Sequence, residues 1–131
     1  MRRATSDLYY AMFHTLCETL AGLVDTSHPT AIGKEAWLGL YRMPDHKQAE
    51  KRCADGRINE FPDGIGNFAR LFVTFKTKRE DADYDGLARF AISQVRNDLI
   101  VVEACIADFH RVDPSLKQQF ALFAALRPRG G

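Results

Sequence analysis

Between residues 5 and 24, large apolar side chains recur at every fourth position, and this spacing most limits what the chain can fold into. Leu8, Met12, Leu16 and Leu20 are four residues apart, which places them on one face of an α-helix. No segment alternates apolar and polar residues over a length that favours a β-strand. The pattern therefore predicts an all-α protein.

Further helices are expected where the same spacing or a helix-start signal returns. They cover residues 31–43, 65–78, 93–110 and 113–126, with Ser93 and Asp113 as the N-caps of the last two. Pro44 and Asp45 either end the helix over 31–43 or open a short polar one over 45–54. The glycines and prolines of 55–66 predict a loop, and 82–86 has turn-forming residues without helical periodicity. Together these segments predict an antiparallel bundle of four or five helices in a single domain over residues 1–131.

Two of these helices are expected to bury apolar residues beyond one narrow stripe. In 31–43 the predicted apolar side includes Ile32, Trp37 and Tyr41. In 93–110 the main stripe includes Leu99, and a second buried side is expected. Its members are Ile100, Val101 and Cys105.

Charge and cysteine content exclude several classes of protein. The 131 residues carry 18 Lys and Arg against 17 Asp and Glu, so binding to nucleic acid through bulk charge is excluded, although a small local site is not. The three cysteines are far apart and include no Cys-x-x-Cys pair, which argues against a disulfide framework and a zinc ribbon. The longest aliphatic run, 99–102, is far shorter than the roughly 20 residues of a membrane span. We expect a cytoplasmic protein without a membrane segment.

The first helix carries polar residues beside its apolar stripe. Arg3, Asp7, Tyr10, His14 and Cys17 follow one another at spacings of 4, 3, 4 and 3, which aligns them along one seam. One interpretation is an ion pair between Arg3 and Asp7 beside merely amphipathic residues. The other places Arg3, Tyr10 and His14 in a polar cleft between subunits.

A second group of polar residues lies at the end of the helix over 31–43. Asp45 is adjacent to His46 and could orient its imidazole, while Arg42 could bind a phosphate through two hydrogen bonds. The alternative is a solvated helix end followed by a charged loop.

A third group follows the helix over 65–78, where Arg79 precedes Asp83, Tyr84 and Asp85. Two carboxylates around a tyrosine can bind a cation, accept hydrogen bonds from arginines or cap a helix, and the alternative is an ordinary charged turn. No His is near them in sequence, so we predict no metal site, and no phosphate-binding glycine loop or other cofactor motif is found. No cofactor is expected.

The segment RRAxSxxYYAxFH at residues 2–14 resembles the opening helix of HEPN-domain proteins, which are small bacterial helical bundles. The resemblance continues, in the same order, through 41–46 and 68–73 to ADYD at 82–85. It implies a bundle that forms a homodimer with a cleft at the interface. Many such proteins are metal-independent ribonucleases, often toxins with an antitoxin partner or parts of defence systems, whereas others only bind nucleotides or proteins.

The chain departs from the usual catalytic pattern of the family, an arginine followed by four to six residues and then a histidine. Arg42-x-x-x-His46 is the nearest match and is one residue too short. We therefore expect a dimeric module of a toxin–antitoxin or defence system that binds a nucleotide, RNA or a protein partner without strong catalysis.

The alternative is a metal-independent endoribonuclease with a composite site at the dimer interface. Its base would be His14 or His46, and a cation would stabilise the charge that develops on the phosphate. The candidate cations are Arg3, Arg42 and Arg79. Tyr10 and Tyr84 could position the phosphate or stack on a base, and Asp83 is a further candidate binding residue.

Overall fold

The protein is all-helical in the part of the chain that the computed structural model describes, which is residues 2–84 and 92–127, with side chains over 5–80 and 94–127. Six α-helices and one short 3-10 helix form this part, where the sequence predicted four or five helices. Their bounds are α1 Arg2–Ala21, α2 Ala31–Tyr41, α3 His46–Cys53, η1 Gly56–Glu60, α4 Asp63–Tyr84, α5 Ile92–His110 and α6 Pro114–Ala125.

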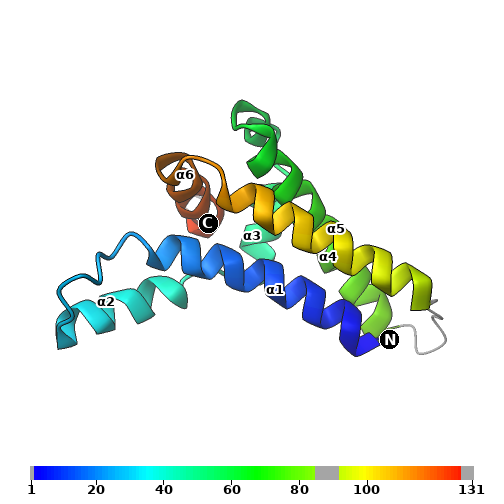
Figure 1. Ribbon diagram of the computed structural model, residues 1–131, viewed down its shortest axis with the longest axis horizontal. Coiled ribbons are helices and arrows are strands. Elements are labelled where there is room, and N and C mark those ends of the chain that lie inside the picture. The colour runs from blue at the N-terminus through cyan, green and yellow to red at the C-terminus, as the bar shows by residue number, and fades with distance from the viewer. Residues whose placement is uncertain (1, 85–91, 128–131) are drawn as a thin grey trace.

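Helix α1 is the element around which the others gather, because it packs against α2, α4, α5 and α6. Figure 1 shows α1 and α2 as one antiparallel pair and α4 and α5 as another. Helix α3 packs mainly against α4 and α6. The all-α prediction is confirmed, and α3 is the short polar helix that the sequence left as one of two alternatives.

The core is built mainly from the apolar stripes of α1, α4, α5 and α6. Leu8, Met12, Leu16 and Leu20 are all buried, as their spacing predicted. Helix α4 contributes its phenylalanines, and Phe68 stacks on Phe109 of α5 with ring centroids 4.5 Å apart. Burying this apolar surface supplies most of the free energy that holds the helices together.

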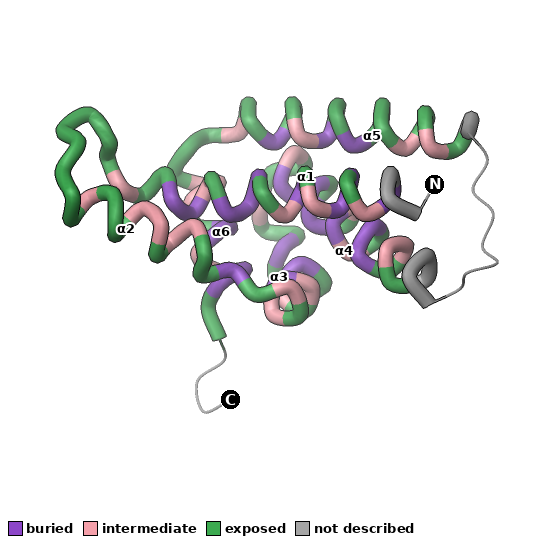
Figure 2. The backbone as a smooth tube through the Cα atoms, turned by 90° about the horizontal axis from the view of Figure 1, so that it is seen from below, coloured by how far each residue is buried: buried purple, intermediate pink, exposed green. Residues whose placement is uncertain are grey.

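Helix α2 contradicts the expected burial, since none of its residues is buried. Figure 2 shows α2 as an arm that extends with the end of α1 beyond the rest of the bundle. Ile32 is 81% exposed, and Trp37 is only half-buried. The apolar side of α2 is only half-buried against α1, its main neighbour, and Ile32 at its start is left exposed.

The expectation of a second buried side on α5 is wrong. Ile100 is 64% exposed, Val101 is 49% exposed, and Leu99 of the main stripe is 44% exposed. Cys105 is buried as predicted. In the described structure α5 is an outer helix that packs on α1 and α4 from one side, so one stripe suffices for its contacts.

Helix boundaries differ from the sequence expectation at three places. Helix α4 begins at Asp63, inside the expected loop, and continues to Tyr84, so residues 82–84 of the predicted turn are helical, while residues 85 and 86 lie outside the described part of the chain. The loop also contains the 3-10 helix η1. Helix α5 begins at Ile92, so Ser93 lies within its first turn and is not its N-cap. Asp113 does cap α6, since its carboxylate accepts the backbone N–H of Ser115 at 2.8 Å.

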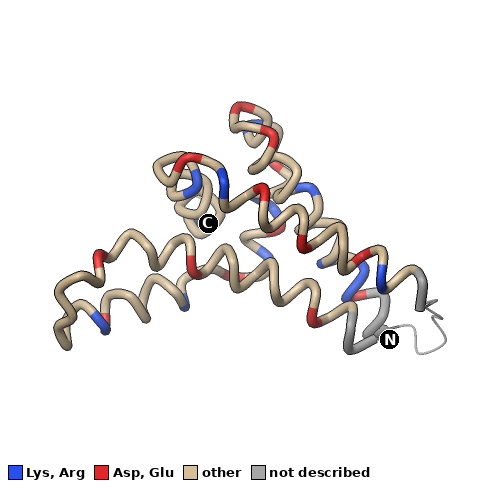
Figure 3. Tube along the Cα trace, viewed as in Figure 1, with Lys and Arg blue, Asp and Glu red and all other residues tan. Residues whose placement is uncertain are grey.

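Positive and negative side chains are interspersed along the described helices, as the near-neutral net charge implies (Figure 3). No helix in the described part of the chain is both long enough and apolar enough to cross a membrane.

Candidate functional site

Seven aromatic and basic side chains from four helices come together along α1. We call this group the Tyr–His cluster. Its members are Tyr9, Tyr10, Phe13, His14, Tyr41, His46 and Arg79. Tyr9 and Phe13, like Tyr10 and His14, are four residues apart, so α1 presents them as two adjacent columns. Helix α2 supplies Tyr41, α3 supplies His46 and α4 supplies Arg79.

His46 is held between two side chains of α1. Its imidazole stacks on the ring of Phe13, with centroids 3.9 Å apart and an angle of 18° between the planes. The hydroxyl of Tyr9 lies 2.6 Å from its Nδ1. Burial lowers the pKa of His46, and the positive charges of Arg79 and Lys76 lower it further. The imidazole is therefore neutral at pH 7.

The Tyr9 contact assigns the tautomer of His46. Burial raises the pKa of Tyr9, so its hydroxyl keeps its proton. A buried hydroxyl needs an acceptor for its proton, and Nδ1 of His46 is the atom that it contacts, so we assign the hydroxyl as the donor and place the imidazole proton on Nε2. His46 thus presents an N–H donor to a ligand while its other nitrogen is occupied.

Arg79 supplies the positive charge of the cluster. Its guanidinium donates a hydrogen bond to the hydroxyl of Tyr10 at 2.9 Å. The same group lies over two rings, 4.9 Å from the centroid of Tyr10 and 5.5 Å from that of Tyr9. Arg79 reaches this position because α4 continues beyond residue 78, where the sequence predicted that the helix ends.

His14 forms the exposed edge of the cluster. Its Nδ1 lies 2.7 Å from the hydroxyl of Tyr41, which joins α1 to the end of α2. Tyr41 in turn stacks on Trp37, with centroids 5.1 Å apart and planes 19° apart. His14 and Tyr10 are also in ring contact, with centroids 6.3 Å apart. A continuous row of ring contacts therefore runs from Tyr10 through His14 and Tyr41 to Trp37.

A second positive charge lies behind the cluster. Lys76 of α4 is only 4% exposed and pairs with Glu80 one turn later and with Glu50 of α3 at 3.7 Å. These pairs neutralise much of its charge. They also tie α3 to α4 on the side from which His46 projects.

The structure brings together four of the predicted site residues, namely Tyr10, His14, His46 and Arg79. Arg42 is exposed, and no hydrogen bond or ion pair joins its side chain to the described cluster residues. Asp45 does not orient the imidazole of His46. Its carboxylate caps α3 by accepting the N–H of Gln48 at 3.0 Å, and Tyr9 holds His46 in its place. The side chains of Arg3, Asp83 and Tyr84 lie outside the described residues.

Three cluster residues were missed as site residues from the sequence. Tyr9, Phe13 and Tyr41 were assigned to apolar faces, and Tyr9 is indeed fully buried. One signal was available in the sequence, because a tyrosine on a buried helix face needs a partner for its hydroxyl. The identity of that partner depends on the folded structure and could not be predicted.

Other reactive groups lie away from the cluster. Burial raises the pKa of the Cys17 and Cys105 thiols to about 11 and that of Cys53 to about 12, so all three are protonated at neutral pH. Among the described residues, no three His, Cys, Asp or Glu side chains gather as a metal site requires. A cavity of about 500 Å³ lies at the far end of the α1–α2 arm, between residues 24–31 and Trp37.

Comparison with protein-family models, curated proteins and solved structures finds no match for this chain.

Proposed function

We propose that the protein is a dimeric helical module, similar to HEPN-domain proteins, that binds a nucleotide or RNA at the Tyr–His cluster without strong catalysis. One observation carries the proposal: the Arg79 guanidinium lies against Tyr10, beside the imidazoles of His14 and His46. A guanidinium and imidazole N–H groups bind phosphate, and aromatic rings stack on bases. The proposed setting in a toxin–antitoxin or defence system, with a protein partner, rests on the motif resemblance.

The hydrogen bonds of the two histidines favour binding over catalysis. Cleavage of RNA without a metal needs one group to take the proton of the 2′-hydroxyl and another to protonate the leaving oxygen. His46 is neutral, with Nδ1 occupied by Tyr9 and a proton on Nε2, so it is suited to donate a hydrogen bond but not to exchange protons. Only His14 remains for proton transfer.

The ribonuclease alternative is supported by His14 itself. This imidazole is exposed, and Tyr41 contacts its Nδ1. In the tautomer whose Nδ1 proton is donated to Tyr41, Nε2 is free to act as a base. Tyr10 connects it to the cation Arg79. A base and a cation side by side supply the proton acceptor and the charge stabilisation that metal-independent cleavage uses.

Dimer formation is part of the same proposal. Helix α2 is rich in apolar residues, yet none of them is buried, and Ile32 is 81% exposed. Its other large apolar side chains are half-buried rather than fully covered, so a second copy could complete their burial. Because Tyr41 of the cluster is the last residue of α2, a second copy on this face would border the cluster and narrow it to a cleft.

Cleavage and binding assays with the same variants test the proposed function. Purified protein is incubated with tRNA and mRNA in EDTA, and binding of a 5′-phosphorylated diuridine is measured by calorimetry. We expect intact RNA, and dinucleotide binding that Arg79→Gln weakens at least tenfold. Arg79→Lys, which keeps the positive charge, should lose less affinity for the dinucleotide. Arg96→Gln on α5 is the matched control. Cleavage to 2′,3′-cyclic ends that His14→Ala abolishes would establish the ribonuclease instead, and absence of dinucleotide binding would refute the site.

A further inference from the structure

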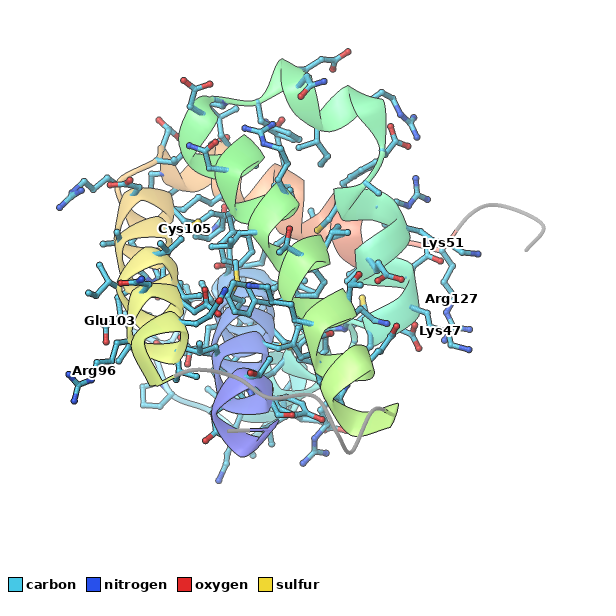
Figure 4. The ribbon with its side chains drawn as sticks, turned by 90° about the vertical axis from the view of Figure 1, so that its right-hand side faces the viewer. Lys47, Lys51, Arg96, Glu103, Cys105 and Arg127 are labelled. Atoms are coloured by element: carbon cyan, nitrogen blue, oxygen red, sulfur yellow. The ribbon has the colours of Figure 1, made fainter. Side chains whose placement is uncertain are left out.

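An exposed group of basic side chains adjoins the Tyr–His cluster across the first turn of α3. We call it the α3 basic patch, and its members are Lys47, Lys51 and Arg127. Lys47 and Lys51 are four residues apart, so they project from one face of α3 with Cβ atoms about 5–6 Å apart. Figure 4 shows these two lysines and Arg127 at the same edge of the molecule.

Arg127 reaches the patch because the chain after α6 is fastened to α3. The carbonyl oxygen of Leu126 accepts hydrogen bonds from Nε2 of Gln48 at 3.0 Å and from Nε of Arg52 at 3.3 Å. Arg127 also contributes to the lowered pKa of Asp45, which places its charge near the start of α3. Segments about 80 residues apart in sequence thus form one basic surface, which could not be predicted from the sequence alone.

The carboxylates near the patch are already engaged. Asp45 caps α3 through the N–H of Gln48, and Glu50 faces Lys76. Within the described residues, no ion pair joins Lys47, Lys51 or Arg127 to a carboxylate. Arg127 lies near the Asp45 carboxylate, but three cations around one carboxylate leave a net positive charge, which favours an anionic ligand.

We propose that the α3 basic patch binds the backbone phosphates of a single-stranded RNA whose end is held in the Tyr–His cluster. This inference rests on the proposed function of the cluster. His46 of the cluster and Lys47 of the patch are consecutive residues of α3 and project about 100° apart around its axis, so a strand that leaves the cluster meets the patch after passing around the first turn of α3. A basic track next to aromatic rings is the combination by which proteins hold single strands.

Two other anionic partners fit the surface less well. Binding to an anionic membrane through charge takes about four to eight clustered cations, and the described patch has three. An acidic peptide would use the lysines but would gain nothing from the rings of Tyr10, His14 and Tyr41, which are suited to bases.

The patch predicts a length dependence that the cluster alone would not produce. A dinucleotide occupies the cluster only, whereas a ten-residue oligouridine reaches Lys47 and Lys51. Each neutralised phosphate of a single strand contributes about 0.7 to the slope of log affinity against log salt. Removing both lysines should therefore lower that slope by about 1.4 for the ten-mer and weaken its binding about tenfold at 0.1 M salt.

The test compares Lys47→Gln/Lys51→Gln with wild type and with Arg96→Gln/Arg111→Gln, a control that removes the same charge from exposed positions elsewhere. Binding of labelled ten-mer and dinucleotide is followed by fluorescence anisotropy between 50 and 200 mM salt. We expect the lysine variant to lose affinity and salt dependence for the ten-mer alone, and the control to keep both. Circular dichroism verifies that all variants are folded.

The opposite results separate the two proposals. A lysine variant that binds the ten-mer with wild-type affinity and slope, while Arg79→Gln weakens both ligands, would refute the patch and leave the cluster standing. If Arg79→Gln leaves both oligonucleotides unaffected, the proposed function fails and the patch inference with it. Phosphatidylserine vesicles and polyglutamate are added as further ligands. Tighter lysine-dependent binding to either than to the ten-mer would overturn the assignment to RNA.

Discussion

The hydroxyl of Tyr9 in α1 lies 2.6 Å from Nδ1 of His46 in α3, and this contact joins the buried face of the first helix to the candidate site. Tyr9 is fully buried, so its hydroxyl gains a partner only because α3 begins at His46. The same bond leaves Nε2 as the nitrogen that His46 can offer to a ligand. Folding and the proposed binding therefore depend on one hydrogen bond.

Removing the Tyr9 hydroxyl should lower the free energy of unfolding more than removing the Tyr41 hydroxyl does. Tyr9→Phe leaves a half-buried Nδ1 without its donor, and we expect the free energy of unfolding to fall by about 1–2 kcal/mol. Tyr41→Phe is the matched control, because it removes the corresponding hydroxyl from the exposed His14 contact and should cost less than about 0.5 kcal/mol. Urea denaturation measures both, and equal losses would contradict the role assigned to Tyr9.

The lowered pKa of His46 predicts how stability depends on pH. Burial, Arg79, Lys76 and His14 all disfavour the protonated form, and only Asp45 opposes them. The unfolded chain, with a histidine pKa near 6.5, therefore binds more protons than the folded one below that pH. The contribution of His46 to the free energy of unfolding is therefore fully present above pH 6.5. It is lost as the pH falls, by at most about 1.4 kcal/mol per pH unit.

His46→Gln isolates this effect from the other titrating groups. Its free energy of unfolding should change less than that of wild type between pH 7 and pH 5, when both are measured by urea denaturation. Parallel profiles would show that His46 is not held neutral by its surroundings.

Two glycines predict opposite effects of the same substitution. A Cβ at Gly64 would lie 2.7 Å from Cγ2 of Val112 and 3.1 Å from the carbonyl oxygen of Asp108, so Gly64→Ala should destabilise the protein by about 1–3 kcal/mol. A Cβ at Gly39 in α2 meets no atom within 4 Å, and Gly39→Ala should stabilise by about 0.5–1 kcal/mol. Thermal melting of the two variants checks the signs, and a stabilised Gly64→Ala would show that α4 and the end of α5 are not packed this closely.

The proposed dimer has a direct test in solution mass. Light scattering at micromolar concentration should give twice the protomer mass of 14.8 kDa for wild type. Ile32→Lys on the uncovered face of α2 should give a monomer, whereas Ile100→Lys, an equally drastic change at the exposed face of α5, should leave the dimer intact. A monomeric wild type would overturn dimerisation, and a monomer only for Ile100→Lys would move the interface to α5.

The sequence predicted the features that depend on interactions between residues close together in the chain. The fourfold spacing of Leu8, Met12, Leu16 and Leu20 gave the first helix and its buried face, because burial of one helix stripe depends only on spacing. Burial on α2 and α5 was overestimated because the same pattern does not say how many neighbours a helix has. Ile100 looks like a core residue until the structure shows α5 covered from one side.

The site shows the same division. Tyr10, His14, His46 and Arg79 were all recognised as polar residues out of keeping with their surroundings, but their convergence depends on α4 continuing past residue 78. Lys76 and Arg79 stabilise that continuation by contacts with α3 and α1, which no local pattern contains. The role of Tyr9 was hidden for the same reason.

The central claim, that a phosphate-bearing ligand binds at the Tyr–His cluster, is tested most directly by the imidazole signals of the four histidines. His14 and His46 lie in the cluster, whereas His28 precedes α2 and His110 ends α5, so the molecule contains its own controls. The measurement is a carbon–proton correlation spectrum, assigned with single His→Gln variants and recorded while 5′-phosphorylated diuridine is added. We expect the signals of His14 and His46 to shift and saturate while those of His28 and His110 stay unchanged. Four unchanged signals at millimolar dinucleotide, or shifts confined to His28 and His110, would contradict the account.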